Sequence, residues 1–336
     1  MPGFKIWLNT PIGHVAQIST DMTLADHLGS WKVRWGIGRS RFIVPPGLYA
    51  VGRPDEDSPV IVTANYKMSY DIVRSNLKNH NVWLLVLETY GINVWCAAGK
   101  GTFGTKELIH RIQQSGLSQV VQHKRLILPI LGAPGIAAHV VTKRTGFSIH
   151  YATLRAEDLP EYLDSGLKTT ARMKELSFSL RERAILIPVD AVQKMQATLP
   201  ILVLLFLCGW GINNLNTGIS ASLAYLGAVL TGTVLAPLLL PLIPGKSFAL
   251  KGVQLGLLWS VTWYLYAGHE LRAPEILGSL LVFTSISAWC AFGFTGSTPF
   301  TSLSGVRKEL RIALPASAAG FISGSLLWAW TILTSL

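Results

Sequence analysis

Charged residues are distributed very unevenly along this chain of 336 residues. Residues 1–190 carry 15 of the 18 acidic residues and 22 of the 29 lysines and arginines. No aspartate, glutamate, lysine or arginine occurs in residues 195–245, 252–269, 276–306 or 312–336. Uncharged apolar stretches of about 20 residues are long enough to cross a bilayer as helices. The pattern therefore predicts a polar N-terminal domain followed by a transmembrane domain.

The predicted transmembrane domain occupies residues 196–336 and is expected to be all-α, with five helices. The expected spans lie at about 196–212, 219–242, 250–267, 274–294 and 312–333. Small residues recur within them and would allow the helices to approach one another closely. A polar stretch, residues 167–195, is predicted to form a helical linker between the two domains.

Basic residues predict the orientation of these spans. Arg181, Arg183 and Lys194 precede the first span, and further lysines and arginines lie between spans two and three and between spans four and five. The other two loops between spans contain only one lysine or arginine, Arg272. By the positive-inside rule, we expect a multi-pass protein of the cytoplasmic membrane, with its N-terminal domain in the cytoplasm and its C-terminus outside. The N-terminus has no apolar segment typical of a signal peptide.

Charge and cysteine content exclude several classes of protein. The net charge is +11, but no run of lysine and arginine is longer than a dipeptide, so we expect no nucleic-acid partner. The three cysteines are Cys96, Cys208 and Cys290. They are too few for a disulfide scaffold or for a self-contained iron–sulfur cluster, which needs four thiolates.

Strand-like and helix-like segments alternate in the N-terminal domain, which we place at residues 1–166. Residues 31–52 are interpreted as short strands with turns. The further expected strands are 59–66, 82–89, 119–123, 125–131 and 147–154, and the expected helices are 68–79, 103–116, 133–146 and 156–166. This alternation predicts a Rossmann-like α/β domain with a mostly parallel sheet. Ligands of such sheets bind beyond the carboxyl ends of the strands.

Cys96 lies in one of the loops expected at that edge, within the sequence NVWCAAGKGTFGT at residues 93–105. It could be a buried structural cysteine. A phosphate-binding loop is excluded because AAGKGT departs from the required pattern at both ends. A redox cysteine would lack a Cys-x-x-Cys partner. A metal-bound thiolate is a further interpretation, and at a helix start beside Lys100 we expect a lowered pKa of the thiol. Ala97 and Ala98 would let a flat macrocycle approach, and Trp95 could pack on it.

The eight residues NVWCAAGK resemble the cap-helix signature of the mercury-methylation corrinoid proteins, the HgcA family. Two further segments, VTANYKMSYD at 62–71 and LPILGAPGIAAH at 128–139, are similar to parts of the corrinoid iron–sulfur protein. The resemblance implies a cobalamin-type corrinoid whose cobalt takes Cys96 as its lower axial ligand. The other residues expected around the corrinoid are Asn93, Val94, Trp95, Ala97, Ala98, Gly99, Lys100, Thr102, Thr105, Thr63, Asn65, Tyr66, Gly132, Ala133 and Pro134.

The resemblance also implies an activity. By this resemblance the chain would be an anaerobic, corrinoid-dependent methyltransferase. It would pass a methyl group, as a carbanion equivalent, from methyl-Co(III) corrinoid to Hg(II) and produce methylmercury. An anionic ligand opposite the methyl group would favour its departure, as thiolate ligation does at haem iron. The implied partners are a ferredoxin-like protein, HgcB, which carries [4Fe-4S] clusters and donates electrons, and methyltetrahydrofolate, acting through a separate methyltransferase.

Two alternative functions remain open. One is a corrinoid methyl carrier with a different physiological acceptor. The other is a membrane transporter with a cytoplasmic regulatory domain, although the predicted spans contain hardly any charged residue that could line an ion path.

Overall fold

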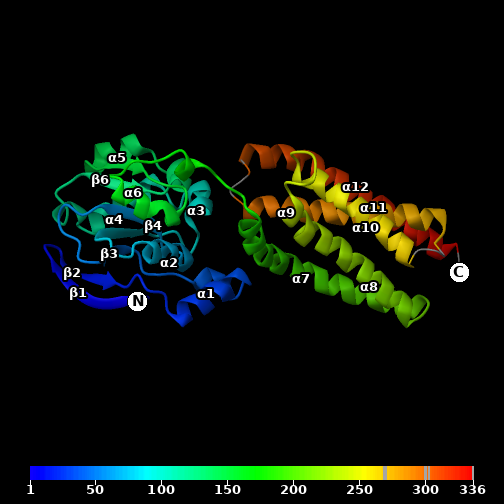
Figure 1. Cartoon of the computed structure of the whole chain (residues 1–336). Helices are drawn as coiled ribbons and strands as arrows, with labels where there is room; N and C mark the ends of the chain where they lie inside the picture. The colour runs from blue at the N-terminus through cyan, green and yellow to red at the C-terminus, as the bar shows by residue number, and fades with distance from the viewer. Residues whose placement is uncertain (268–270, 299–300, 302, 335–336) are drawn as a thin grey trace. The chain divides into compact units, whose positions relative to one another are not determined.

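The computed structural model describes residues 1–267, 271–298, 301 and 303–334 (Figure 1). The chain forms two compact units. The first comprises Met1–Val33 and Ile37–Ser177, and the second comprises Arg34–Gly36 and Phe178–Leu336. The first unit is a mixed α/β domain and the second is helical, which confirms the predicted fold classes.

A seven-stranded sheet with the order β1-β2-β3-β5-β4-β6-β7 forms the centre of the first unit. Neighbouring strands pair in parallel in β2–β3, β5–β4, β4–β6 and β6–β7, and antiparallel in β1–β2 and β3–β5. The sheet is therefore mostly parallel, as predicted. The strands are β1 Phe4–Thr10, β2 Gly13–Ile18, β3 Gly47–Val51, β4 Val60–Ala64, β5 Val82–Leu87, β6 Arg125–Leu128 and β7 Ser148–Tyr151.

Helices cover both faces of this sheet. All residues of β4 and β5 are buried, as expected for central strands covered on both sides. Val62 packs in a cluster with Leu108 of α4, whereas its neighbour Ile61 packs in a second cluster with Tyr70 of α2. The helices of the unit are α1 Leu24–Arg34, α2 Lys67–Asn76, α3 Val94–Lys100, α4 Thr105–Gln114, α5 Ala138–Thr145 and α6 Leu159–Asp164.

Short 3₁₀-helices connect several of these elements. They are η1 Arg39–Arg41, η2 Leu117–Gln119, η3 Ile130–Gly135, η4 Ala156–Asp158 and η5 Arg172–Lys174. The predicted strand at 119–123 is wrong, because η2 and turns occupy this region. The predicted strand at 125–131 ends at Leu128, since Pro129 leads into η3.

The interpretation of residues 31–52 as short strands is correct only for β3. Residues 24–34 form a helix because Thr23 and Asp26 cap its start reciprocally. The backbone N–H of Asp26 donates to the Thr23 hydroxyl (3.2 Å), and the N–H of Thr23 donates to the Asp26 carboxylate (3.0 Å). Thr-x-x-Asp is an acidic variant of the capping box and was a readable helix signal.

The second unit consists of helices. Among the described residues, four are long and apolar enough to cross a membrane: Leu180–Ile212, Leu215–Leu239, Ala273–Gly296 and Ser304–Thr331. The predicted linker and the first predicted span share one of these helices, α7. Helix α10 covers the third predicted span but is not one of the four, so five spans remain a prediction. The elements are α7 Leu180–Ile212, α8 Leu215–Leu230, the π-turn η6 Thr231–Leu235, α9 Ala236–Leu239, α10 Phe248–Ala267, α11 Ala273–Gly293, η7 Phe294–Ser297 and α12 Leu303–Leu333.

Candidate functional site

Three segments that contain predicted site residues meet beyond the carboxyl ends of the parallel strands. The chain leaves β5 at Leu87 and enters α3, which carries Cys96. Helix α3 packs against η3, the segment that follows β6. Asn65, directly after β4, bonds to residues of the loop between β5 and α3. The segments from which site residues were predicted are thus adjacent in the fold.

Helix α3 is short and is fixed at both ends. The Asn93 side-chain oxygen accepts a hydrogen bond from the backbone N–H of Cys96 (2.9 Å), so Asn93 is the N-cap. At the other end Gly101 adopts a left-handed conformation with φ of 81°, and its N–H bonds to the Ala98 carbonyl. The Thr102 N–H bonds to the carbonyl of Ala97. Cys96, three residues after the N-cap, is therefore held on a closed two-turn helix.

Burial raises the pKa of the half-buried Cys96 thiol, and the positive charges of Lys100 and Arg39 and the Asn93 side chain oppose this effect without cancelling it. The prediction of a lowered pKa is wrong because desolvation outweighs the nearby positive charge. Arg39, in η1, was not predicted as part of the site. Its neighbour Ser40 lies against Gly91, where an added Cβ would be 3.3 Å from the Ser40 carbonyl oxygen. This long-range contact has no signature in the sequence.

Ala97 and Ala98 face the protein interior, with exposed fractions of 0% and 5%. Their small side chains allow η3 to pack closely against α3, and their contact with a macrocycle stays a prediction. A Cβ added to Gly135 would lie 3.1 Å from the Ala98 Cα and 2.1 Å from the Phe103 carbonyl oxygen. The exposed residues of α3 are instead Gly99 and Lys100.

Asn65 is a buried hydrogen-bonding centre. Its side-chain NH₂ donates to Glu88 (2.7 Å), and its side-chain oxygen accepts from the N–H of Thr89 (3.0 Å) and of Gly91 (3.2 Å). The amide therefore holds the loop that leads into α3. Thr63 and Tyr66, which flank this position in the sequence, are also buried, with exposed fractions of 1% and 4%.

The predicted residues of η3 divide into buried and exposed ones. Gly132 is buried, and an added Cβ there would lie 2.6 Å from a ring carbon of Phe103. Ala133 is half-buried and Pro134 is exposed. The Thr105 hydroxyl accepts a hydrogen bond from the N–H of Ala137 (2.8 Å), which ties the start of α4 to the segment after η3. Val94, Trp95 and Thr102 are half-buried.

A cavity of about 240 Å³ lies at the same edge of the sheet. Thr63 of β4, Val94 of α3 and Leu131 of η3 contribute to its wall, together with Thr153 and Arg155 after β7. Its position beyond strand ends and its mainly apolar wall are typical of a small-molecule site.

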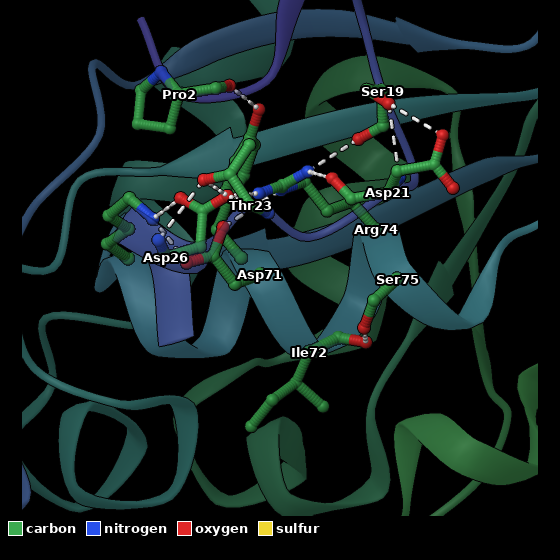
Figure 2. Close-up of polar contacts among 11 residues, drawn as sticks. Pro2, Ser19, Asp21, Thr23, Asp26, Asp71, Ile72, Arg74 and Ser75 are labelled. Atoms are coloured by element: carbon green, nitrogen blue, oxygen red, sulfur yellow. Dashed lines mark hydrogen bonds and ion pairs between the residues drawn. The ribbon is translucent and has the colours of Figure 1, made fainter. Parts of the chain in front are cut away.

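A second cluster of polar groups lies on α2 and faces the N-terminal segment (Figure 2). Arg74 pairs with Asp71 (2.8 Å) and Asp26 (2.9 Å), and it also donates to the carbonyls of Ser19 (2.7 Å) and Asp21 (2.9 Å). Lys67 bridges the same two carboxylates. Two cations and two carboxylates thus satisfy one another within the fold.

Residues 38–153 match the family model described as CO dehydrogenase/acetyl-CoA synthase delta subunit. The first unit resembles this family from β3 to β7. Curated relatives include the subunit gamma of the acetyl-CoA decarbonylase/synthase complex of Methanopyrus kandleri, 33% identical over 123 residues, which are 36% of this chain and 26% of the relative. That of Methanothermobacter thermautotrophicus is 34% identical over 123 residues, with the same shares. The chain spans about a quarter of the length of these relatives.

Proposed function

We propose that the first unit binds a cobalamin-type corrinoid through Cys96 and that the chain is a corrinoid-dependent methyltransferase that methylates Hg(II), as in the HgcA family. The observation that carries the proposal is the position of the thiol. Cys96 is half-buried on a capped helix beyond the carboxyl end of β5, with Lys100 and Arg39 nearby, in the segment that matches the delta-subunit family.

The residues present fit such a cofactor. Cys96 provides one soft donor, so the remaining donors to a metal would come from the ligand, as they do in a macrocycle. Exposed Gly99 and Gly101, where an added Cβ meets nothing within 4 Å, leave space beside the helix. When bound, a corrinoid supplies a cobalt centre that can accept a methyl group and release it. Cys96, in its thiolate form, would hold the cobalt.

The protein's own contribution is to hold that thiol and to favour its anion on binding. Burial raises the pKa of Cys96 and so favours the protonated thiol in the apoprotein; metal binding would release this proton. Lys100 and Arg39 favour the thiolate electrostatically. The Asn93 cap, the Asn65 hydrogen bonds and the contact between α3 and η3 fix the helix, so a bound metal would meet a preorganised ligand.

The surrounding roles follow from the same proposal. The cavity lined by Thr63 and Val94 would accommodate a part of the ligand. The second unit would anchor the protein in the cytoplasmic membrane, with the first unit in the cytoplasm. Electrons would come from the [4Fe-4S] clusters of HgcB, and the methyl group from methyltetrahydrofolate through a separate methyltransferase.

The test uses the full chain in lipid nanodiscs, reconstituted with cobalamin. We expect an absorbance spectrum of thiolate-ligated cobalt that is lost in Cys96→Ala and kept in the matched variant Cys208→Ala. With a reducing system and a methyl donor, only the two proteins that retain Cys96 should convert Hg(II) to methylmercury. Stoichiometric cobalamin binding with identical spectra for all three proteins would contradict ligation by Cys96.

A second acceptor is a specific alternative because the curated relatives are named for acetyl-CoA decarbonylase/synthase complexes. In this case Cys96 would keep its role while Hg(II) would not be the substrate. The same reconstituted protein distinguishes the two: a cobalamin spectrum that depends on Cys96, without methylmercury formation at any Hg(II) concentration, would favour the other acceptor.

A further inference from the structure

Helix α1 has an inverted distribution of polar and apolar residues. Its buried residues are Asp26 and Val33, with exposed fractions of 7% and 1%. Leu24, Leu28 and Trp31 are exposed, with fractions of 75%, 50% and 62%. Their spacing of four and three residues places these three side chains on one face of the helix. A helix of a soluble domain normally buries such a face and exposes its carboxylate.

The burial of Asp26 fixes this orientation. Its carboxylate accepts hydrogen bonds from Lys67 (2.5 Å) and Arg74 (2.9 Å), so the helix cannot rotate without breaking both ion pairs (Figure 2). Gly29 lies on the same inner side, where an added Cβ would be 2.8 Å from the ring of Phe42. The apolar face is therefore turned outward by the buried ion pairs of the first unit.

The apolar character continues beyond α1. Trp35, Ile37 and Ile43 are 42%, 63% and 47% exposed. Basic residues are interspersed with them, whereas no acidic residue occurs between residues 27 and 54. The basic residues of this segment are Lys32, Arg34, Arg39 and Arg41. Leucine and tryptophan on one face with flanking lysine and arginine are the composition of helices that lie in the interface of an anionic membrane.

We propose that α1 and the segment up to Ile43 lie on the surface of the lipid bilayer, with Leu24, Leu28 and Trp31 inserted among the lipids. The charge of this segment selects a lipid surface as the occupant of the face, because lysines and arginines without acidic neighbours in the sequence complement anionic headgroups. The inference rests on the proposed membrane location and is independent of the corrinoid.

Spin labels in the full chain, reconstituted in nanodiscs with anionic lipid, test this inference. All labels are placed in a variant in which Cys96, Cys208 and Cys290 are replaced by alanine. The test position is Leu28→Cys. Gln113→Cys, on the exposed surface of α4, is the aqueous control, and Leu204→Cys, on the exposed surface of α7, is the lipid control. Collision with oxygen reports lipid exposure, and collision with a water-soluble nickel chelate reports water exposure.

We expect the label at position 28 to collide with oxygen as the label at position 204 does, and to collide with the nickel chelate several-fold less often than the label at position 113. Replacing Lys32 and Arg41 by glutamine should raise the nickel collision rate at position 28, because the attraction to anionic headgroups is lost.

Two outcomes overturn the inference. A label at position 28 that is as accessible to nickel as position 113 would place α1 in water. Exclusion of both oxygen and nickel would mean that another protein surface or a second copy covers the face. The label at position 204 separates this failure from a failure of the proposed membrane location, because a water-exposed position 204 would contradict both.

Discussion

The first unit contains two clusters of polar groups that differ in how their charges are satisfied. Around Arg74, two cations and two carboxylates pair with one another, largely shielded from water. Around Cys96, Arg39 and Lys100 approach a thiol, and among the described residues neither of these cations forms an ion pair with a carboxylate. We call the first cluster closed, because each of its charges is paired with an opposite charge. We call the second cluster open, because its positive charges are not paired with a carboxylate in the described part of the chain.

This difference separates structure from function. A closed cluster has no capacity left for a ligand, and its value is in holding α1, α2 and the N-terminal segment together. An open cluster retains the capacity to stabilise an anion, which in this fold would be the thiolate of Cys96. Both clusters combine basic residues with a buried or half-buried acidic group, so residue types alone do not distinguish them. The distinction lies in whether each charge already has a partner.

The largest effect is expected when the closed cluster is opened. Arg74→Met leaves Lys67 as the only cation that pairs with the carboxylates of Asp26 and Asp71, and breaking a buried ion pair from one side typically costs about 3–5 kcal/mol. We expect a loss of hydrogen-exchange protection across α1 and α2. The matched variant Arg53→Met, at an exposed position, should leave protection unchanged. Equal losses of protection in the two variants would mean that the ion pairs of Arg74 do not hold α1 and α2 together.

Acid should open the same cluster. Burial raises the pKa of Asp26, but the bonds from Lys67 and Thr23 outweigh it and hold the pKa well below its ordinary value of 3.8. The carboxylate therefore contributes stability that is fully present above pH 3.8 and is lost as pH falls toward the folded pKa. Hydrogen exchange of α1 between pH 6 and 2 measures the first part of this loss. Asp26→Asn, which lacks the titrating group, should show a smaller dependence on pH in that range.

A smaller effect is expected at the N-cap of α3. Asn93→Ala removes the acceptor of the Cys96 N–H and should cost about 1 kcal/mol of local stability, whereas Asn93→Ser should retain most of it. Hydrogen exchange of residues 94–100 measures the change. Unchanged exchange in Asn93→Ala would show that the cap does not position the thiol. The cluster around Cys96 would then be less preorganised than the hydrogen bond of Asn93 implies.

The smallest effect concerns the charges of the open cluster. Arg39→Gln and Lys100→Gln each remove a positive charge that lowers the pKa of Cys96, so each should raise that pKa further. Alkylation of Cys96 at pH 8, followed by mass spectrometry of the peptide, should become slower in both variants because less thiolate is present. Lys106→Gln, an exposed change on α4, serves as the control. A rate that does not change in either variant would mean that the two cations do not act on the thiol.

The strongest sequence signals concerned the regions where burial is uniform. The continuous apolar runs at β4 and β5 predicted two central strands, and the position of Cys96 after β5 placed it at the ligand-binding edge. The missed features depend on contacts between distant segments. The proximity of Arg39 to Cys96 requires the packing of residues 40–43 on Gly91, and the inward position of Ala97 requires η3. The pKa of the thiol was misjudged because local charge is visible in a sequence and desolvation is not.

The contact at Gly135 affects how this site can evolve by substitution. There the Phe103 carbonyl and the Ala98 Cα occupy the space of a side chain, so α3 is positioned by main chain against main chain. Residues on its outer surface, such as Lys100, take no part in that contact. Substitutions on this surface can therefore alter the charge around the thiol while the sulfur stays in place. In this fold the position of the Cys96 sulfur and the reactivity of its thiol can therefore evolve independently.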